Sequence, residues 1–437
     1  MTTITIDEAL DRAGAGTYQK RLIGIFGLVW AADAMQVLAV GFTAASIAAT
    51  FGLTVPQALQ TGTLFFFGML LGAILFGRLA DRFGRRSILI VTVACDAVFG
   101  LLSVFAPDFT ILLLLRFLTG LAVGGTLPVD YAMMSEFLPA RNRGRWLVVL
   151  EGFWAIGTLA VALAAWLVSL AGVEDGWRYI FAVTALPAVV GVGLRFLVPE
   201  SPLYLMRTAR FAEAKSTIDQ ILVVNGKAPL PAVQQIAPPA PVQDARIFSG
   251  PLRQRSMMIL AIWFLVSVSY YGVFTWMPPR LAGEGFGFVR GYGFLVLVTL
   301  AQLPGYALAA YGVEKWGRRP TLIGFCLLSA AGCLLFVTAA DATLIGASLL
   351  IMSFALLGTW GGLYAMTPEL YPTTSRATGM GAAGAMARFG GLLAPSLMAL
   401  VVAQSFGLAI AIFAGLLLLA AVAAYMIDTE TRSASLA

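Results

Sequence analysis

Histidine is absent from this chain of 437 residues, and cysteine occurs only three times. Without histidine, the commonest general base and metal ligand is missing, so any proton relay has to use carboxylates. Cys95, Cys326 and Cys333 are scattered through the sequence and predict neither a disulfide framework nor a metal cluster. No convincing nucleophile motif is present either. These absences argue against an enzyme, and neither a cofactor nor a metal site is expected.

Charge is scarce as well, since 11% of the residues are charged and 59% are hydrophobic. A soluble domain carries about 25% charged residues, so this chain is expected to lie in lipid. Its long apolar runs predict an all-α membrane protein, because backbone groups in hydrocarbon must be bonded within their own segment. Twelve transmembrane helices are predicted, at roughly 22–48, 58–80, 87–106, 110–138, 146–171, 177–198, 256–279, 291–313, 320–340, 343–367, 377–403 and 406–427.

The distribution of basic residues predicts the orientation in the membrane. The predicted outer loops hold only Arg178, Arg280 and Arg290, whereas the loops on the other side are rich in Lys and Arg. By the positive-inside rule, both termini then lie in the cytoplasm. The net charge of +6 therefore reflects topology and does not indicate nucleic-acid binding. The acidic residues near the amino terminus and the long first apolar run predict no cleavable signal.

A charged pattern occurs twice along the chain. Asp81-Arg82-Phe83-Gly84-Arg85-Arg86 returns as Glu314-Lys315-Trp316-Gly317-Arg318-Arg319, and each glycine is followed 52 residues later by a glutamate, Glu136 or Glu369. Arg143 and Arg376 each follow seven residues after that glutamate. Such a duplication predicts two half-molecules that rock around a central site.

The domain prediction follows from this repeat. Residues 1–198 form a first six-helix half and residues 255–437 a second half with a short cytoplasmic tail, and the proline-rich residues 199–254 form a cytoplasmic linker. Within the linker, the periodicity from Arg207 to Val224 predicts a short surface helix.

Several strings resemble the major facilitator superfamily, over essentially the whole chain. Gly77 to Arg86 resembles the loop between helices 2 and 3 of that superfamily, and Pro199-Glu200-Ser201-Pro202 and Pro368-Glu369 resemble its sugar-porter pattern. Trp30 to Met35, Ser135 to Pro139, Tyr270-Tyr271-Gly272 and Thr367 to Pro372 resemble the branch that contains synaptic vesicle glycoprotein relatives and bacterial nicotinate transporters. The resemblance implies a monomer in the plasma membrane, with a bacterial inner membrane favoured. Gln36 departs from it, because the branch is expected to carry Glu there.

Two charges inside the predicted spans are candidates for proton coupling. Asp33 lies on the first span and Arg116 on the fourth, at depths that differ by only several ångströms when counted at ~1.5 Å per residue. In sugar-porter-like proteins the corresponding Asp and Arg form the proton-coupling pair, and the resemblance implies that role here. Asp33 would be stabilised as a carboxylate beside Arg116 and take a proton when the helices part. The alternative is a structural salt bridge.

The repeated charges at the cytoplasmic rim are predicted to form a conformational latch. Arginine–carboxylate pairs would hold helix ends together while the cavity faces outward and separate when it opens inward. The predicted latch residues are Asp81, Arg85, Glu136, Arg143, Glu314, Arg318, Glu369 and Arg376. Glu151, which follows the loop arginines, is expected to join this network. The alternative is that these charges only set the topology.

A substrate site is predicted around Arg388, which lies near the midplane of the eleventh span without an acid in its own segment. An unpaired cation beside a cavity suits an anionic substrate; the alternatives are that it bonds a helix carbonyl or an acid of the other half. The further substrate-binding candidates are Gln36, Asp130, Tyr131, Trp154, Tyr270, Tyr271, Gln302, Trp360 and Tyr364. Their aromatic rings favour a flat substrate. Asp130 shares a helix face with Arg116 and is therefore a candidate for the inner half of the same cavity, and Asp96 is expected to belong to a polar network.

Three functions are compatible with these features. The first is proton-coupled uptake of a small organic anion, such as nicotinate or a related aromatic carboxylate, by alternating access. The second is proton–sugar symport, which is less favoured because the pore-lining helices of the second half offer little beyond Gln302 to bond hydroxyl groups. The third is a non-transporting membrane receptor, which has no need of two matched sets of latch charges.

Overall fold

The computed structural model describes residues 3–139, 143–231, 234–237, 247–250, 252–284, 291–371, 376–402 and 404–431. Twelve helical segments among them are long and apolar enough to cross a membrane, which confirms the predicted fold class. The helices of the first half are α1 (Ile6–Ala13), α2 (Thr17–Phe51), α3 (Val55–Ala58), α4 (Gln60–Phe83), α5 (Arg85–Val104), α6 (Phe109–Ser135), α7 (Arg143–Ala171) and α8 (Gly176–Arg195). The linker contributes α9 (Pro202–Arg207) and α10 (Phe211–Val224). The second half contains α11 (Leu252–Glu284), α12 (Tyr292–Leu300), α13 (Gln302–Lys315), α14 (Arg318–Thr338), α15 (Ala342–Met366), a 3₁₀ turn (Thr367–Leu370), α16 (Arg376–Val402) and α17 (Phe406–Tyr425).

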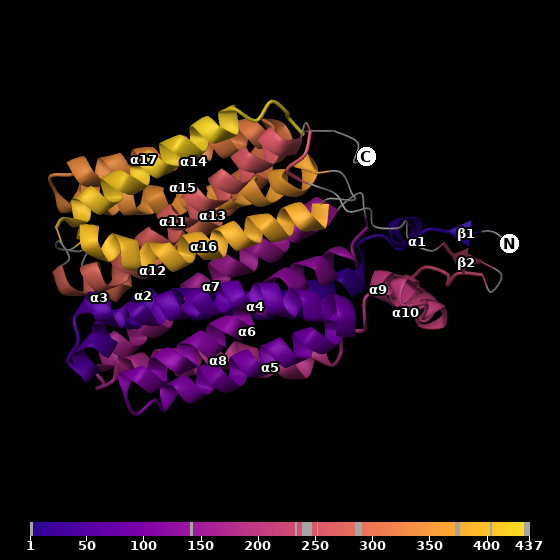
Figure 1. Ribbon diagram of the computed structural model, residues 1–437, viewed down its shortest axis with the longest axis horizontal. Helices are drawn as coiled ribbons and strands as arrows, with labels where there is room; N and C mark the ends of the chain where they lie inside the picture. Colours follow the sequence, from indigo (N-terminus) through magenta and orange to yellow (C-terminus); the bar gives the residue numbers. More distant parts are fainter. Residues whose placement is uncertain are drawn as a thin grey trace.

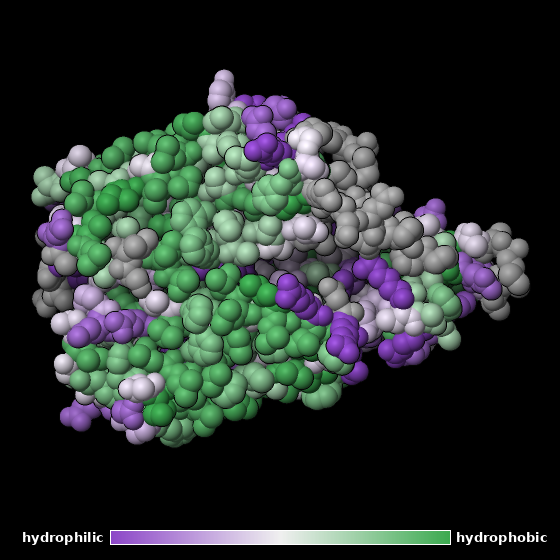
Figure 2. Space-filling model, viewed as in Figure 1, coloured by the Kyte–Doolittle hydropathy of each residue, from purple (hydrophilic) through white to green (hydrophobic). Residues whose placement is uncertain are grey.

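The long helices run side by side in two groups, with those of the first half below and those of the second half above (Figure 1). Both chain ends lie at one end of the bundle with α1, α9 and α10, and this is called the N/C end; the opposite end is the far end. On the face shown in Figure 2, apolar side chains cover most of both groups, and Leu167, Leu170 and Leu400 are 62%, 68% and 73% exposed. Such a surface is satisfied only by lipid, so the chain is a multi-pass membrane protein.

Four local features differ from the prediction. The first helix begins at Thr17, and the eighth span is two helices, α12 and α13, that meet at Ala301. Pro304, which lacks an N–H, occupies the first turn of α13, where no intrahelical donor is needed. In the linker, Ala209 takes a positive φ of 58°, which ends α9 and delays the surface helix to Phe211. A short parallel pair, β1 (Thr3–Ile4) with β2 (Gln235–Ile236), also ties the amino terminus to the linker.

The repeat governs packing as well as charge. Asp108 caps α6 by accepting a hydrogen bond from Ile111 N at 2.9 Å, and Asp341, 233 residues later, caps α15 by accepting from Leu344 N at 2.9 Å. Gly72 and Gly305 are also 233 residues apart. A Cβ on Gly72 would lie 2.0 Å from Leu121 O, and one on Gly305 would lie 2.2 Å from Phe354 O. Each half therefore contains the same close helix crossing, which only glycine permits.

The two halves meet on both sides of the molecular centre. Toward the far end, α2 and α11 approach so closely that a Cβ on Gly41 would lie 2.7 Å from Phe274 O, and the Tyr292 hydroxyl donates to Phe42 O at 3.1 Å. Toward the N/C end, the rings of Tyr131 and Tyr364 lie 5.8 Å apart. A cavity lies between these contacts.

Candidate functional site

The central cavity takes its walls from both halves. Its lining residues are Trp30, Leu127, Glu151, Trp154, Tyr270, Tyr271, Tyr306, Trp360, Tyr364, Ala387 and Arg388. The space inside it that a water molecule can occupy is about 20 Å³, and one water needs about 10–15 Å³. The cavity therefore has room for about one water in this conformation, and its walls must part before a small ligand can enter. Six of the predicted substrate-binding residues lie in its wall: Trp154, Tyr270, Tyr271, Trp360, Tyr364 and Arg388.

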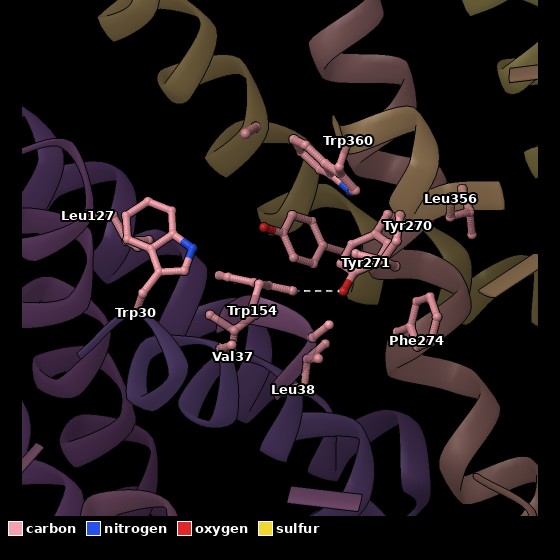
Figure 3. Close-up of a cluster of buried hydrophobic side chains, with 14 of the residues drawn as sticks. Trp30, Val37, Leu38, Leu127, Trp154, Tyr270, Tyr271, Phe274, Leu356 and Trp360 are labelled. Atoms are coloured by element: carbon pink, nitrogen blue, oxygen red, sulfur yellow. Dashed lines mark hydrogen bonds between the residues drawn. The ribbon is translucent and has the colours of Figure 1, made fainter. Parts of the chain in front are cut away.

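Aromatic rings form most of the wall, and they hold one another in place. Trp30 and Leu127 face Tyr270, Tyr271 and Trp360 across the cavity, with Trp154 between them (Figure 3). The Trp154 indole donates to the Tyr270 hydroxyl at 2.9 Å, which joins α7 to α11. The Tyr270 ring meets Trp360 edge to face at 5.8 Å. Rings packed in this way offer rigid flat surfaces to a ligand.

A row of four rings crosses from one half to the other on the N/C side of the cavity. Trp30 and Tyr131 lie 6.0 Å apart, Tyr131 and Tyr364 5.8 Å, and Tyr364 and Trp263 4.8 Å. Trp30 and Trp263 are 233 residues apart in the sequence, and so are Tyr131 and Tyr364. The row therefore joins two copies of one pair at the interface. Tyr131 belongs to this row, beside the cavity and outside its lining.

The polar groups of the cavity are few and incompletely bonded. Arg388 donates through Nη1 to Gly384 O at 3.0 Å, as one of the alternatives proposed, but its buried Nε has no partner among the described residues. Trp360 Nε1 and Glu151 Oε1 are buried without a partner in the same part of the chain, and the Trp30 indole lies beside the Glu151 carboxylate as a donor. Two donors and one acceptor are thus left for a ligand. This balance suits an acceptor-rich, anionic molecule.

Glu151 was expected in the rim network, and that interpretation is wrong. The side chain is 2% exposed and lines the cavity, where Arg388 is its principal charged neighbour. Glu151 lies two turns inside α7, and Trp154, three residues on, shares its helix face. Because Trp154 was already a candidate, helical spacing could have identified Glu151. Trp30 and Tyr306 were likewise missing from the predicted site.

Asp33 and Arg116 do not pair in this structure. Arg116 lies between the rings of Phe65 and Phe181 and donates to Gln36 Oε1 at 2.7 Å and to Gln36 O at 2.8 Å. Gln36 is one helical turn nearer the far end than Asp33, at the depth where the Arg116 side chain reaches α2. Asp33 is 0% exposed, and neither of its carboxylate oxygens has a partner among the described residues. Gln36 is therefore a hydrogen-bond partner of Arg116 and does not line the cavity.

Asp130 also lies away from the cavity, and its prediction as a lining residue is wrong. It forms an ion pair with Arg195 of α8, and both side chains are almost fully buried. Asp130 does share a face with Arg116, but that face packs against α8 and α2, where Phe181 and Phe26 cover the two arginines. Gln302 is buried outside the cavity lining with both amide atoms unpartnered among the described residues. Asp96 is also buried, and its carboxylate oxygens have no hydrogen-bond partner among the described residues. Asp33 and Arg116 are its electrostatic neighbours.

Matched charge networks occupy the N/C ends of both halves. Glu136 pairs with Arg85 and accepts from the Ser201 hydroxyl; Glu369 accepts from Arg318 Nε and Nη2, both at 3.0 Å, and from Thr431 Oγ1 at 2.6 Å. Burial raises the pKa of the Glu136 carboxyl, although Arg85 and Ser201 act in the opposite direction. Each network joins helix ends of a single half, with Ser201 of the linker added to the first, so each braces its own half.

A second carboxylate completes each network. Glu200 accepts from Arg86 N at 3.2 Å, and Glu430 accepts from Arg318 N at 2.9 Å and Arg319 N at 3.1 Å. These bonds satisfy free N–H groups at the start of α5 and α14. Gly84 and Gly317 take φ values of 97° and 107° just before these helices, a conformation that favours glycine. This explains why the glycine recurs in the repeat.

Other predicted latch residues behave differently. Arg143 pairs with Asp7 at 2.7 Å and not with Glu136, because α1 lies beside the start of α7. Glu314 is exposed and forms no ion pair within the described residues. The side chains of Asp81 and Arg376 lie outside the part of the chain that the structure describes.

A central cavity between two repeat-related groups of membrane-spanning helices is typical of a secondary transporter. The model of the family described as "Sugar (and other) transporter" matches residues 22–437, and the chain belongs to this family of the major facilitator superfamily. It is a family of transporters and not of enzymes. The resemblance seen in the sequence is therefore confirmed.

Individual relatives agree with this assignment. The chain is 35% identical to the niacin transporter NiaP of Acinetobacter baylyi over 96% of both chains. It is 30% identical to the synaptic vesicle 2-related protein of Xenopus laevis, covering 99% of this chain and 82% of that protein. A solved structure of the xylose transporter XylE from E. coli, partially occluded and inward open, superposes with a TM-score of 0.75 at 20% identity, covering 95% of this chain and 99% of that one. At this identity the likeness concerns the fold alone.

Proposed function

We propose that this protein imports a small aromatic carboxylate of the nicotinate type by proton-coupled symport and alternating access. The observation that carries the proposal is the cavity of rigid aromatic walls, in which Arg388 Nε and the Trp360 indole N–H have no acceptor among the described residues. When the halves part enough to admit it, a flat carboxylate can lie between the rings and accept from these donors. The name of the Acinetobacter relative, a niacin transporter, supports the same substrate class.

The orientation proposed is that the N/C end faces the cytoplasm of a bacterium. The loops at this end contain most of the Lys and Arg residues, which favours a cytoplasmic position. Residues 1–198 and 255–437 then act as the two moving halves, joined by residues 199–254, and one chain forms the transporter. Opening inward separates Tyr131 from Tyr364, and opening outward separates Phe42 from Tyr292.

Asp33 remains the proposed proton carrier of the first half. It is a buried carboxyl without a hydrogen-bond partner among the described residues, and Asp96, Asp130, Arg195 and Arg388 are its electrostatic neighbours. A buried carboxyl with both acids and arginines around it changes protonation when the helices that carry those charges move. In this view the Arg116–Gln36 bond is one arrangement of the cycle, and an Asp33–Arg116 pair would belong to another.

Uptake into proteoliposomes tests the proposal. Purified protein is reconstituted with an inward-directed proton gradient, and labelled nicotinate, nicotinamide and xylose are offered separately. We expect uphill accumulation of the acid that a protonophore abolishes, and little accumulation of the neutral amide or the sugar. Accumulation of the amide equal to that of the acid would rule out an anion site at Arg388. Sugar transport is less favoured because none of the described lining residues is Asn or Gln.

A further inference from the structure

Glu151 and Arg388 are the charged residues that line the cavity, and they come from opposite halves of the molecule. Glu151 lies on α7 and Arg388 on α16, and each has a buried polar atom without a partner among the described residues. Neither belongs to the rim networks. With Glu151 ionised, their charges would balance while the cavity is empty.

The other groups around Glu151 leave this balance unchanged. Tyr131 on α6, Tyr271 on α11, Tyr306 on α13 and Tyr364 on α15 are its ionisable neighbours besides Arg388, and tyrosine is neutral at physiological pH. The neighbour on α2 is Trp30, an uncharged donor. Within the described residues, α8 and α12, which also pack on α7, present no ionisable group to Glu151. Asp33 has other electrostatic neighbours, among which Glu151 does not occur.

A bound carboxylate upsets the balance. With an anion on Arg388, the cavity would hold two negative charges and one positive charge, and an uncompensated buried charge is strongly unfavourable. A proton taken from water by the Glu151 carboxylate restores neutrality. The protonated carboxyl also gains an O–H donor, which can bond the carboxylate or a ring nitrogen of the ligand.

We propose that Glu151 is the proton-binding residue of the substrate site, so that an aromatic carboxylate occupies Arg388 together with one proton on Glu151. This inference rests on the proposed function and adds to it the residue that links substrate and proton. Asp33 differs from Glu151 because it lies outside the cavity wall, where the bound substrate does not reach it. Protonation of Glu151 responds to the ligand, whereas protonation of Asp33 responds to helix movement.

Calorimetry on the purified full-length protein tests this inference with nicotinate and with benzoate, which lacks the ring nitrogen. Titrations in two buffers of different ionisation enthalpy count the protons taken up per bound acid. We expect about one proton for the wild type where Glu151 is ionised in the empty protein, and a Kd that rises about tenfold per pH unit in that range. Both acids remain anionic between about pH 6 and pH 8, since free carboxyls have a pKa near 4.

Two matched variants separate the outcomes. Glu151→Gln keeps the shape of the protonated side chain, so we expect it to bind the acids with a Kd independent of pH and without proton uptake. Glu174→Gln, an exposed loop residue, should behave as the wild type. Proton uptake by Glu151→Gln equal to that of the wild type would overturn the inference and leave the proposed function standing. A wild-type Kd that is flat from about pH 6 to pH 8 would overturn it as well, even if the variant failed to fold. If no aromatic acid bound the wild type, the proposed function itself would fail.

Discussion

The pairing of Arg85 with Glu136 leads to a quantitative prediction. Both side chains are largely buried, with 13% and 12% of their surfaces exposed. Arg85→Gln would leave the Glu136 carboxylate buried, with the Ser201 hydroxyl as its remaining hydrogen-bond donor among the described residues and Arg207 as a nearby positive charge. Removing one partner of a buried pair typically costs about 3–5 kcal/mol, and because some surface remains exposed we expect about 3 kcal/mol. Arg143→Gln is the control: its partner Asp7 is 61% exposed, so the loss should stay within about 0–1 kcal/mol.

The same reasoning predicts how pH and a second substitution change the stability of Arg85→Gln. Burial raises the pKa of Glu136, and loss of Arg85 raises it further. A carboxyl with a raised folded-state pKa stabilises the fold at low pH, and that contribution is lost as pH rises through the folded-state pKa. Arg85→Gln should therefore recover stability on acidification. Adding Glu136→Gln removes the unpaired charge, so the double variant should be more stable than Arg85→Gln near neutral pH.

Denaturant titration of the purified protein in detergent measures these free energies of unfolding. The wild type, both single variants at Arg85 and Glu136, the double variant and Arg143→Gln are compared near neutral and at acidic pH. If the two single losses simply added in the double variant, Glu136 would not be a charge that depends on Arg85. An Arg85→Gln loss no larger than that of Arg143→Gln would refute the argument from burial.

Three further predictions concern transport. Arg388→Ala should weaken nicotinate binding at least about thirtyfold, since a desolvated charge-assisted contact is worth about 2–5 kcal/mol. Arg388→Lys should restore little of the binding because lysine lacks the planar fork of arginine. Calorimetry measures both variants, and a Kd of Arg388→Ala within threefold of the wild type would make Arg388 structural. Asp33→Asn should abolish accumulation driven by a pH gradient and retain part of the binding, and undiminished uphill uptake would exclude Asp33 as a proton carrier. Tyr364→Ala removes the ring that meets Tyr131, so double electron–electron resonance between labels at the N/C ends of α6 and α15 should show longer distances, whereas an unchanged distribution would reduce the pair to ordinary packing.

The class of fold was predictable because its signals are local and strong. Length and hydropathy determine which segments cross a bilayer, and the repeated Gly-Arg-Arg and glutamate pattern indicates two equivalent halves. Depth along a helix could also be counted, so Arg388 was expected near the centre, and the family resemblance placed Trp154, Tyr270 and Trp360 on helices that line the cavity. The structure places all four in the wall of the cavity.

The sequence by itself thus determined the membrane class, the duplication and the depth of each charged residue. Only the tertiary structure decided which direction each helix face points and which residue each charge meets. Asp130 and Arg116 share a face that packs on α8, Arg116 meets Gln36 before it can reach Asp33, and Glu151 faces the cavity. The physical reason is that residue spacing specifies rise and angle within one helix, whereas the neighbour of a face depends on how twelve helices pack against one another.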